Sequence, residues 1–414
     1  MSDKNTHSQV LQQSVPSTLN SIDVDLASAS AKFDEEISIS INLKSLPQLQ
    51  TEVMLESSLI QWLITRWHLA QASGTFEITH PDIEDEDKLF EQLASSAPGA
   101  VLALLPPSKV QGVNRRMAAD FRQRFFKRQN QWPDLALSDS AFLLCVDAFP
   151  KYLPAKLYPE ASHTQVTDWE GYRLLVDGLI NSVAEESKIR GEILRRTDEI
   201  STILFELFKN THDHARFNVK GGVIGESIRG VYSRFYPIGN FRELSSQDQD
   251  LNPVDNYLRA LVRPTFDFQQ RQPRKRDISG FLELSVFDTG PGLAAKWLGR
   301  EISSCDPEAQ YDAVVNCFAK GSSSSREGGR GFGLWRVLQQ LRQIKGFIRV
   351  RTNQLHIYRQ YAQLEDLLKE QHADGHVTPK EKLLDWRRQY TTNPSQYPSV
   401  DGTLISILLP LGEL

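Results

Sequence analysis

The stretch Asp198–Arg216, DEISTILFELFKNTHDHAR, carries two stripes of side chains at helical spacing. One stripe recurs at i, i+3, i+4, i+7 and i+8, as in a helix that buries one face, and consists of Ile200, Ile203, Leu204, Leu207 and Phe208. The other stripe places Glu206, Asn210 and Asp213 along one polar edge. That edge is either a solvated helix face or part of a binding site. The motifs that follow favour a binding site.

Length and composition describe a globular protein. The 414 residues are enough for two or three domains, and 40% hydrophobic with 24% charged residues is ordinary. A net charge of −5 does not support a nucleic-acid binder, although the basic run Arg271–Arg276 keeps that contact open. Cys145, Cys305 and Cys317 form neither a disulfide framework nor a zinc motif. Without a long apolar run or a leader-like N-terminus, we expect no membrane contact and a cytoplasmic location.

The chain divides by composition into a tail and two domains. Residues 1–30 are polar and predict a flexible tail, and residues 31–160 predict a small mixed α/β domain whose role the sequence does not indicate. Its expected strands are Ile37–Leu43, Ala100–Leu105 and Ala141–Val146, and its expected helices are Met54–Ser73 and Arg115–Gln131. Residues 161–414 contain the organising helix and the remaining motifs.

The segment Phe281–Leu293, FLELSVFDTGPGL, combines a strand with a turn. Its apolar residues alternate toward one face, and the period of two places Asp288 on that face. A buried carboxylate needs a hydrogen-bond donor, and the exocyclic amine of adenine is one. Gly290 and Gly292 allow a tight turn and close approach to a flat ring, although a purely structural turn uses the same residues.

The segment Lys320–Leu334, KGSSSSREGGRGFGL, is a Gly- and Ser-rich loop that precedes the expected helix Leu334–Lys345. Such a loop offers backbone N–H groups and the positive end of the helix dipole to phosphates. It matches neither a Walker loop nor a Rossmann fingerprint, and a plain flexible linker is the alternative. Two more strands are expected, Phe347–Thr352 and Val400–Pro410, the second entered by Gly402–Thr403.

These four motifs, in this order, resemble the GHKL ATPase superfamily of gyrases, heat-shock chaperones, histidine kinases and mismatch-repair proteins. ELFKNTHDHA resembles its N-box, DTGPG its adenine box, GGRGFGL its lid box and GTLISILLP its last strand. The resemblance covers about Trp169–Leu414. It implies an α+β protein whose residues 161–414 form a Bergerat-type two-layer sandwich, a mixed sheet with helices on one face, after the small N-terminal domain.

The resemblance also implies roles for individual residues. Asn210 would bind the Mg²⁺ that bridges the phosphates of ATP, and Glu206 would be the general base that activates water. Asp288 would bind the adenine amine with support from Thr403. ATP and Mg²⁺ are therefore the expected cofactors. The other expected contacts with the nucleotide are Asp213, Gly290, Gly292, Lys320, Gly329, Arg330, Gly331, Phe332, Gly333 and Leu334.

Two insertions depart from the family pattern, at about 217–279 and 353–399, and the second is expected to carry helices at Tyr358–Gln371 and Lys380–Gln389. They leave the partner open, and we expect a protein partner or a self-dimer. Three functions remain: an ATPase that signals by lid closure, a kinase of the histidine- or anti-sigma-kinase branch that phosphorylates a partner, and a non-catalytic nucleotide sensor. Two observations favour the ATPase over the kinase. Glu206 is present as a candidate base, and no histidine upstream of the N-box has the setting of a phosphoacceptor.

Overall fold

The computed structural model describes residues 10–12, 15–31, 38–42, 52–73, 76–79, 85–105, 110–111, 114–131, 140–159, 165–183, 187–225, 227–245, 251–262, 265–267, 272–274, 277–302, 305–319, 321, 332–362 and 383–413. They belong to two compact units, Met1–Asn130 with Pro398–Val400, and Gln131–Tyr397 with Asp401–Leu414. Within the described residues, no helix combines the length and the apolar character that crossing a membrane requires.

The first unit is built on a parallel sheet of four strands in the order β1-β2-β3-β4. The strands are β1 (Val10–Gln12), β2 (Ser38–Asn42), β3 (Phe76–Thr79) and β4 (Val110–Gln111). The helices are α1 (Leu19–Ala31), α2 (Leu55–Ser73), α3 (Glu86–Ala94), α4 (Ala97–Leu104) and α5 (Arg115–Gln129). Helices thus alternate with parallel strands, which agrees with the expected mixed α/β character.

Two expectations for the first unit were wrong. Ala100–Leu105 lies in helix α4 and its end, not in a strand, because Ser96 caps the helix by accepting from the Gly99 N–H and a proline occupies the first turn. Every residue of α4 is buried, so its apolar run lacks the periodicity that separates helix from strand. Helix α1 with its buried Leu26 lies largely within the expected flexible tail.

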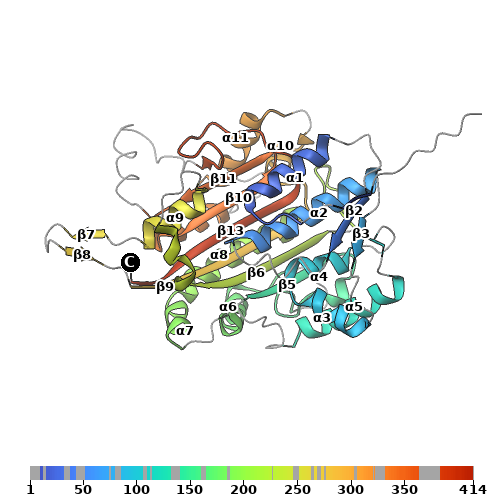
Figure 1. Cartoon of the computed structure of the whole chain (residues 1–414), viewed down its shortest axis with the longest axis horizontal. Coiled ribbons are helices and arrows are strands. Elements are labelled where there is room, and N and C mark those ends of the chain that lie inside the picture. The colour runs from blue at the N-terminus through green and yellow to red at the C-terminus, as the bar shows by residue number, and fades with distance from the viewer. Residues whose placement is uncertain are drawn as a thin grey trace, which may run out of the picture. The chain divides into compact units, whose positions relative to one another are not determined.

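The second unit contains a seven-stranded sheet in the order β12-β11-β10-β13-β9-β6-β5, and Figure 1 shows β6, β9, β13 and β10 side by side. The strands are β5 (Ser140–Val146), β6 (Ile228–Pro237), β9 (Asp277–Asp288), β10 (Phe347–Asn353), β11 (Leu355–Gln360), β12 (Leu384–Asp385) and β13 (Val400–Glu413). Every pairing of described register is antiparallel, so the expected mixed sheet was wrong. A separate hairpin consists of β7 (Thr265–Asp267) and β8 (Gln272–Arg274). The chain is an α+β protein.

The main core of this unit lies between one face of the sheet and six helices. They are α6 (Trp169–Val183), α7 (Ser187–Leu194), α8 (Thr197–Asn210), α10 (Leu293–Leu298), α11 (Pro307–Cys317) and α12 (Gly333–Gln343). The apolar stripe of α8 and the alternate residues Leu282, Leu284 and Val286 of β9 are buried in it, as their spacing predicts. The opposite face is also covered, because Tyr257 of α9 (Pro253–Val262) packs against Phe281 and Phe347. The expectation that helices cover only one face of the sheet is therefore incomplete.

The segment boundaries also differ from expectation. The second unit begins at Gln131, before the expected boundary at residue 160, because β5 pairs along its whole length with β6. The expected insertion at 217–279 contributes β6 and α9. In the other insertion, Tyr358 lies in strand β11, which forms a hairpin with β10, and β12 occupies part of the expected helix Lys380–Gln389. The stretch 363–382 lies outside the described residues. Short turns of other helix types are Pro150–Tyr152, Thr211–Ala215 and Ile238–Ser245.

Candidate functional site

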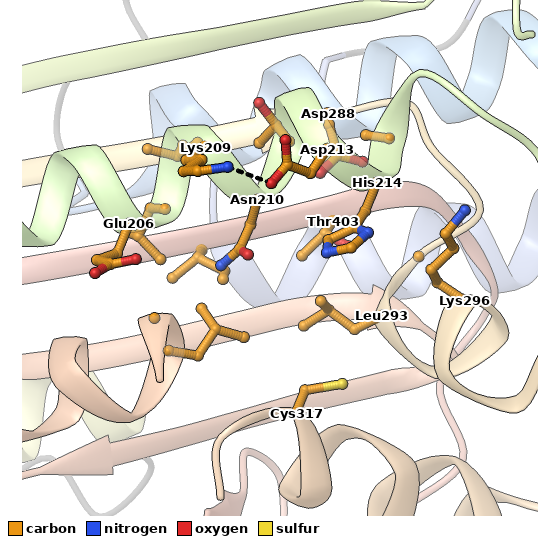
Figure 2. A pocket seen from close by; sticks show the side chains of 18 of the residues that line it. Glu206, Lys209, Asn210, Asp213, His214, Asp288, Leu293, Lys296, Cys317 and Thr403 are labelled. Atoms are coloured by element: carbon orange, nitrogen blue, oxygen red, sulfur yellow. Dashed lines mark hydrogen bonds and ion pairs between the residues drawn. The ribbon is translucent and has the colours of Figure 1, made fainter. Parts of the chain in front are cut away.

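A cavity of about 320 Å³ lies in the second unit, and Figure 2 shows side chains of α8 pointing toward it. Nine of the residues predicted from the sequence line it: Glu206, Asn210, Asp213, Asp288, Gly292, Phe332, Gly333, Leu334 and Thr403. Gly290 lies beside it in the same turn as Gly292. Lys320, Gly329, Arg330 and Gly331 lie outside the described residues. Motifs that are far apart in the sequence therefore meet around one hollow.

Helix α8 and the turn after it supply the polar wall of the cavity. The α-helix ends at Asn210, and Thr211–Ala215 continues as a π-helical turn, a wider form that is frequent at functional sites. Lys209 forms an ion pair with Asp213 one turn away, drawn as a dashed line in Figure 2. Asp213 therefore reaches the cavity with its charge already balanced.

Asn210 presents a side-chain amide whose NH2 group lacks a partner. Its Nδ2 atom is buried and makes no hydrogen bond within the described chain. A buried polar group in this state costs about 1–3 kcal/mol. Because the amide faces the cavity, a ligand atom placed there would recover that energy.

Asp288 stands at the end of β9, at the opposite side of the cavity from Glu206 (Figure 2). Its Oδ1 accepts a hydrogen bond of 2.8 Å from the Gly290 N–H, and Thr403 lies opposite it in the strand register. Burial raises the pKa of Asp288 to about 6, although the backbone N–H groups of Gly290 and Thr403 and the charge of Arg229 oppose the rise. The carboxylate has too few donors for its charge, so it is suited to accept another.

A buried network supports this wall from behind. Arg229 of β6 donates to both carboxylate oxygens of Asp147 and, over 2.7 Å, to the hydroxyl of Tyr158. The same hydroxyl lies 3.0 Å from Nδ1 of His212. These bonds join β6 to the π-helical turn. His212 is thus engaged in packing, whereas His214 of the same turn lines the cavity.

Glu206 is held by a cation that the motifs did not indicate. Its carboxylate oxygen Oε1 lies 2.8 Å from Nη1 of Arg336 on helix α12. The Glu206 side chain is 11% exposed and that of Arg336 is 56% exposed. A Cβ atom on Gly333 would lie 2.7 Å from Oε2 of Glu206, so glycine at this position lets the start of α12 approach α8 closely.

The glycines of the DTGPG turn have packing roles. A Cβ on Gly290 would lie 2.6 Å from Cα of Ala215, so this glycine lets the turn rest on the π-helical segment. Gly292 has a φ of 83°, and a Cβ there would lie 2.4 Å from the side chain of Asn353. Asn353 also donates to the Pro291 carbonyl. The turn is shaped by its neighbours as well as by any ligand.

Among the glycines that the structure describes, Gly402 should be the least tolerant of substitution. Its φ is 67°, and a Cβ would lie 1.7 Å from the carbonyl oxygen of Asp288. We expect Gly402→Ala to lower the free energy of unfolding by about 2–5 kcal/mol, because β13 must shift away from β9 and the backbone is strained. Urea unfolding followed by tryptophan fluorescence measures this. Gly191→Ala, where a Cβ meets nothing within 4 Å, is the control and should unfold at the same or a higher urea concentration.

Sequence reasoning missed several residues of the cavity wall. They are Lys209, His214, Lys296, Trp297, Cys317 and Arg336. Arg336 had a usable signal, because it lies three residues after Gly333 and hence one turn into the helix that follows the lid motif. Lys296, Trp297 and Cys317 belong to helices α10 and α11, which carry no motif. Figure 2 shows Lys296 and Cys317 facing the cavity from these helices.

Within the described residues, no group of three or more His, Cys, Asp or Glu side chains is arranged to hold a metal ion. Comparison of the chain with protein-family models, curated proteins and solved structures gave no match. What the cavity binds is therefore inferred from its own side chains.

Proposed function

We propose that the cavity binds ATP with Mg²⁺ and hydrolyses it, as in the Bergerat-fold domains of the GHKL superfamily. The observation that carries the proposal is that Glu206, Asn210, Asp288 and the first residue of α12 all line one cavity. At one side lies the carboxylate of Asp288, which can accept a hydrogen bond from a nucleobase. At the other side lie the amide of Asn210, the carboxylate of Glu206 and the N-terminus of α12. This is the order of groups along a nucleoside triphosphate.

The adenine end would lie at Asp288. Its carboxylate accepts a hydrogen bond from the exocyclic amine, while Val286, Leu293 and Ile405 supply apolar walls for the ring. Guanine carries a keto oxygen where adenine has the amine, and a carboxylate repels that oxygen. The site should therefore prefer ATP to GTP.

The phosphates would lie at the other end, between Asn210 and the N-terminus of α12. Backbone N–H groups at a helix start attract anions, and the glycine at position 333 brings the start of α12 close to Asn210 without a side chain between them. Mg²⁺ is usually held by one or two protein ligands together with phosphate oxygens. Oδ1 of Asn210 would be such a ligand, and the ion would neutralise charge on the phosphates. The Nδ2 group, which is buried without a hydrogen bond, would donate to a phosphate oxygen.

Glu206 would act as the general base. Its carboxylate takes a proton from a water molecule whose oxygen forms the new bond to the γ-phosphorus, while the bond to the bridging oxygen breaks and ADP leaves. The buried setting of Glu206 keeps bulk water away from this step. Lid closure would then signal to a partner protein or a second copy of the chain.

The test is phosphate release from the purified chain with Mg-ATP, together with calorimetric binding of ATP, ADP and GTP. We expect phosphate release that stops when EDTA removes Mg²⁺, and at least about tenfold weaker binding of GTP. Tight ATP binding without release would favour a kinase or a nucleotide sensor, and radiolabel transfer from γ-labelled ATP to a protein would identify the kinase. Failure to bind any nucleotide would refute the proposal.

A further inference from the structure

We infer that Arg336 senses the γ-phosphate: it holds Glu206 when no triphosphate is bound, and it moves to the γ-phosphate of ATP, which frees the carboxylate for its role as base. This inference rests on the proposed function. It extends that function by proposing that ATP itself regulates its own hydrolysis. ADP, which lacks the γ-phosphate, would leave the Arg336–Glu206 pair intact.

The position of Arg336 in the helix places it at the phosphate end of the cavity. It follows Gly333 by three residues, so the two lie on the same side of α12. Side chains of an α-helix lean toward its N-terminus, which brings the guanidinium back toward the helix start. That start is where N–H groups would receive the phosphates. Arg336 accordingly lines the cavity.

The two partners differ in freedom to move. Glu206 is nearly buried on α8, in the middle of the unit's main helix layer, whereas more than half of the Arg336 side chain is exposed. Within the described chain, the bond from Nη1 to Glu206 is the single side-chain hydrogen bond shown for Arg336, and a guanidinium has five N–H donors. Arg336 is therefore the partner that rotates, with donors to spare.

The γ-phosphate is the stronger competitor for this cation. A guanidinium matches phosphate oxygens with two parallel hydrogen bonds, and the terminal phosphate carries more charge than a carboxylate. While Arg336 engages Oε1 of Glu206, its guanidinium occupies a side of the carboxylate from which water could approach that oxygen, and Oε2 stays open. Transfer of the guanidinium to ATP thus couples substrate binding to the release of the base.

The test compares the affinities of a non-hydrolysable ATP analogue and of ADP, both with Mg²⁺, in the wild type, Arg336→Met and Arg336→Lys. We expect Arg336→Met to weaken binding of the analogue by about 10- to 100-fold while its ADP affinity stays within about twofold, because only the triphosphate meets the guanidinium. Arg336→Lys should recover part of the loss. The control is Arg173→Met, because Arg173 also pairs with an acid on α8, Asp198 at 3.3 Å, but does not line the cavity.

The outcomes separate the two proposals. If the wild type binds neither nucleotide, the proposed function fails and this inference fails with it. If the wild type binds both but Arg336→Met keeps its preference between the analogue and ADP, only the inference is overturned, and Arg336 is a structural partner of Glu206. Thermal unfolding of each variant establishes that it is folded before its affinities are compared.

Discussion

Replacing Glu206 by glutamine is expected to reduce ATP hydrolysis by about 10²- to 10⁴-fold while ATP binding is retained, because a neutral amide cannot accept the proton of the attacking water. Glutamine keeps the size of the side chain, and its amide oxygen still accepts a hydrogen bond from Arg336, which lies 2.8 Å from Oε1 in the wild type. Single-turnover phosphate release measures the chemical step, and calorimetry measures binding.

The control for this variant is Glu199→Gln, the same substitution on the same helix. Glu199 belongs to the first turn of α8 and does not line the cavity, so hydrolysis should stay at the wild-type rate. If Glu206→Gln hydrolyses ATP as fast as the wild type, Glu206 is not the base. Loss of binding in that variant would instead give Glu206 a role in holding the ligand.

Replacing Asp288 by asparagine is expected to weaken ATP binding by about 10- to 100-fold and, at the same time, to stabilise the ligand-free protein. The two effects have one cause, the buried charge at the end of β9. Asparagine still accepts the N–H of Gly290, but it offers the adenine amine a neutral acceptor in place of a charged one. If the variant binds ATP more weakly but unfolds at a higher urea concentration, Asp288 serves ligand binding at the expense of stability.

The stability effect has a defined pH dependence. The pKa of Asp288 is raised to about 6, above the value of about 3.9 in an unfolded chain, so the folded state binds more protons between these values. The carboxyl group therefore favours folding below its unfolded pKa and loses this contribution as the pH rises through 6. At pH 8 the ionised group costs about 1–3 kcal/mol, since one pKa unit corresponds to about 1.4 kcal/mol.

Urea unfolding at pH 8 and pH 4 tests this sign. Asp288→Asn should exceed the wild type in free energy of unfolding at pH 8, and the difference should largely vanish at pH 4. ATP binding by the wild type should weaken as the pH falls through 6, because protonation removes the charged acceptor. Asp177→Asn on α6, away from the cavity, should change neither property. A variant less stable than the wild type at pH 8 would show that Asp288 holds the fold together.

Local pattern determined the central elements of this protein. The stripe from Ile200 to Phe208 predicts α8, and the alternation before Asp288 predicts β9, because each pattern repeats with the period of its own backbone geometry. The same spacing placed Glu206 and Asn210 on one edge, and both line the cavity. These inferences needed only contacts within one element or its turn.

Tertiary structure decided what local pattern leaves ambiguous. The apolar run in α4 is buried all round and has no period, so the Ser96 cap and the surrounding packing decide that it is a helix. β5 pairs with β6, about 80 residues later in the chain, and no local signal records such a partner. The packing of α9 against Phe281 likewise depends on which face of the sheet the other helices leave uncovered.

The same division holds within the site. The sequence by itself determined that Glu206 and Asn210 of this protein share one edge of a helix and that Asp288 ends a strand. Only the tertiary structure decided that Arg336 meets Glu206, that Lys296 and Cys317 join the wall, and that burial raises the pKa of Asp288. The physical reason is that charge pairing and desolvation depend on distances between elements, whereas periodicity is a property of one element.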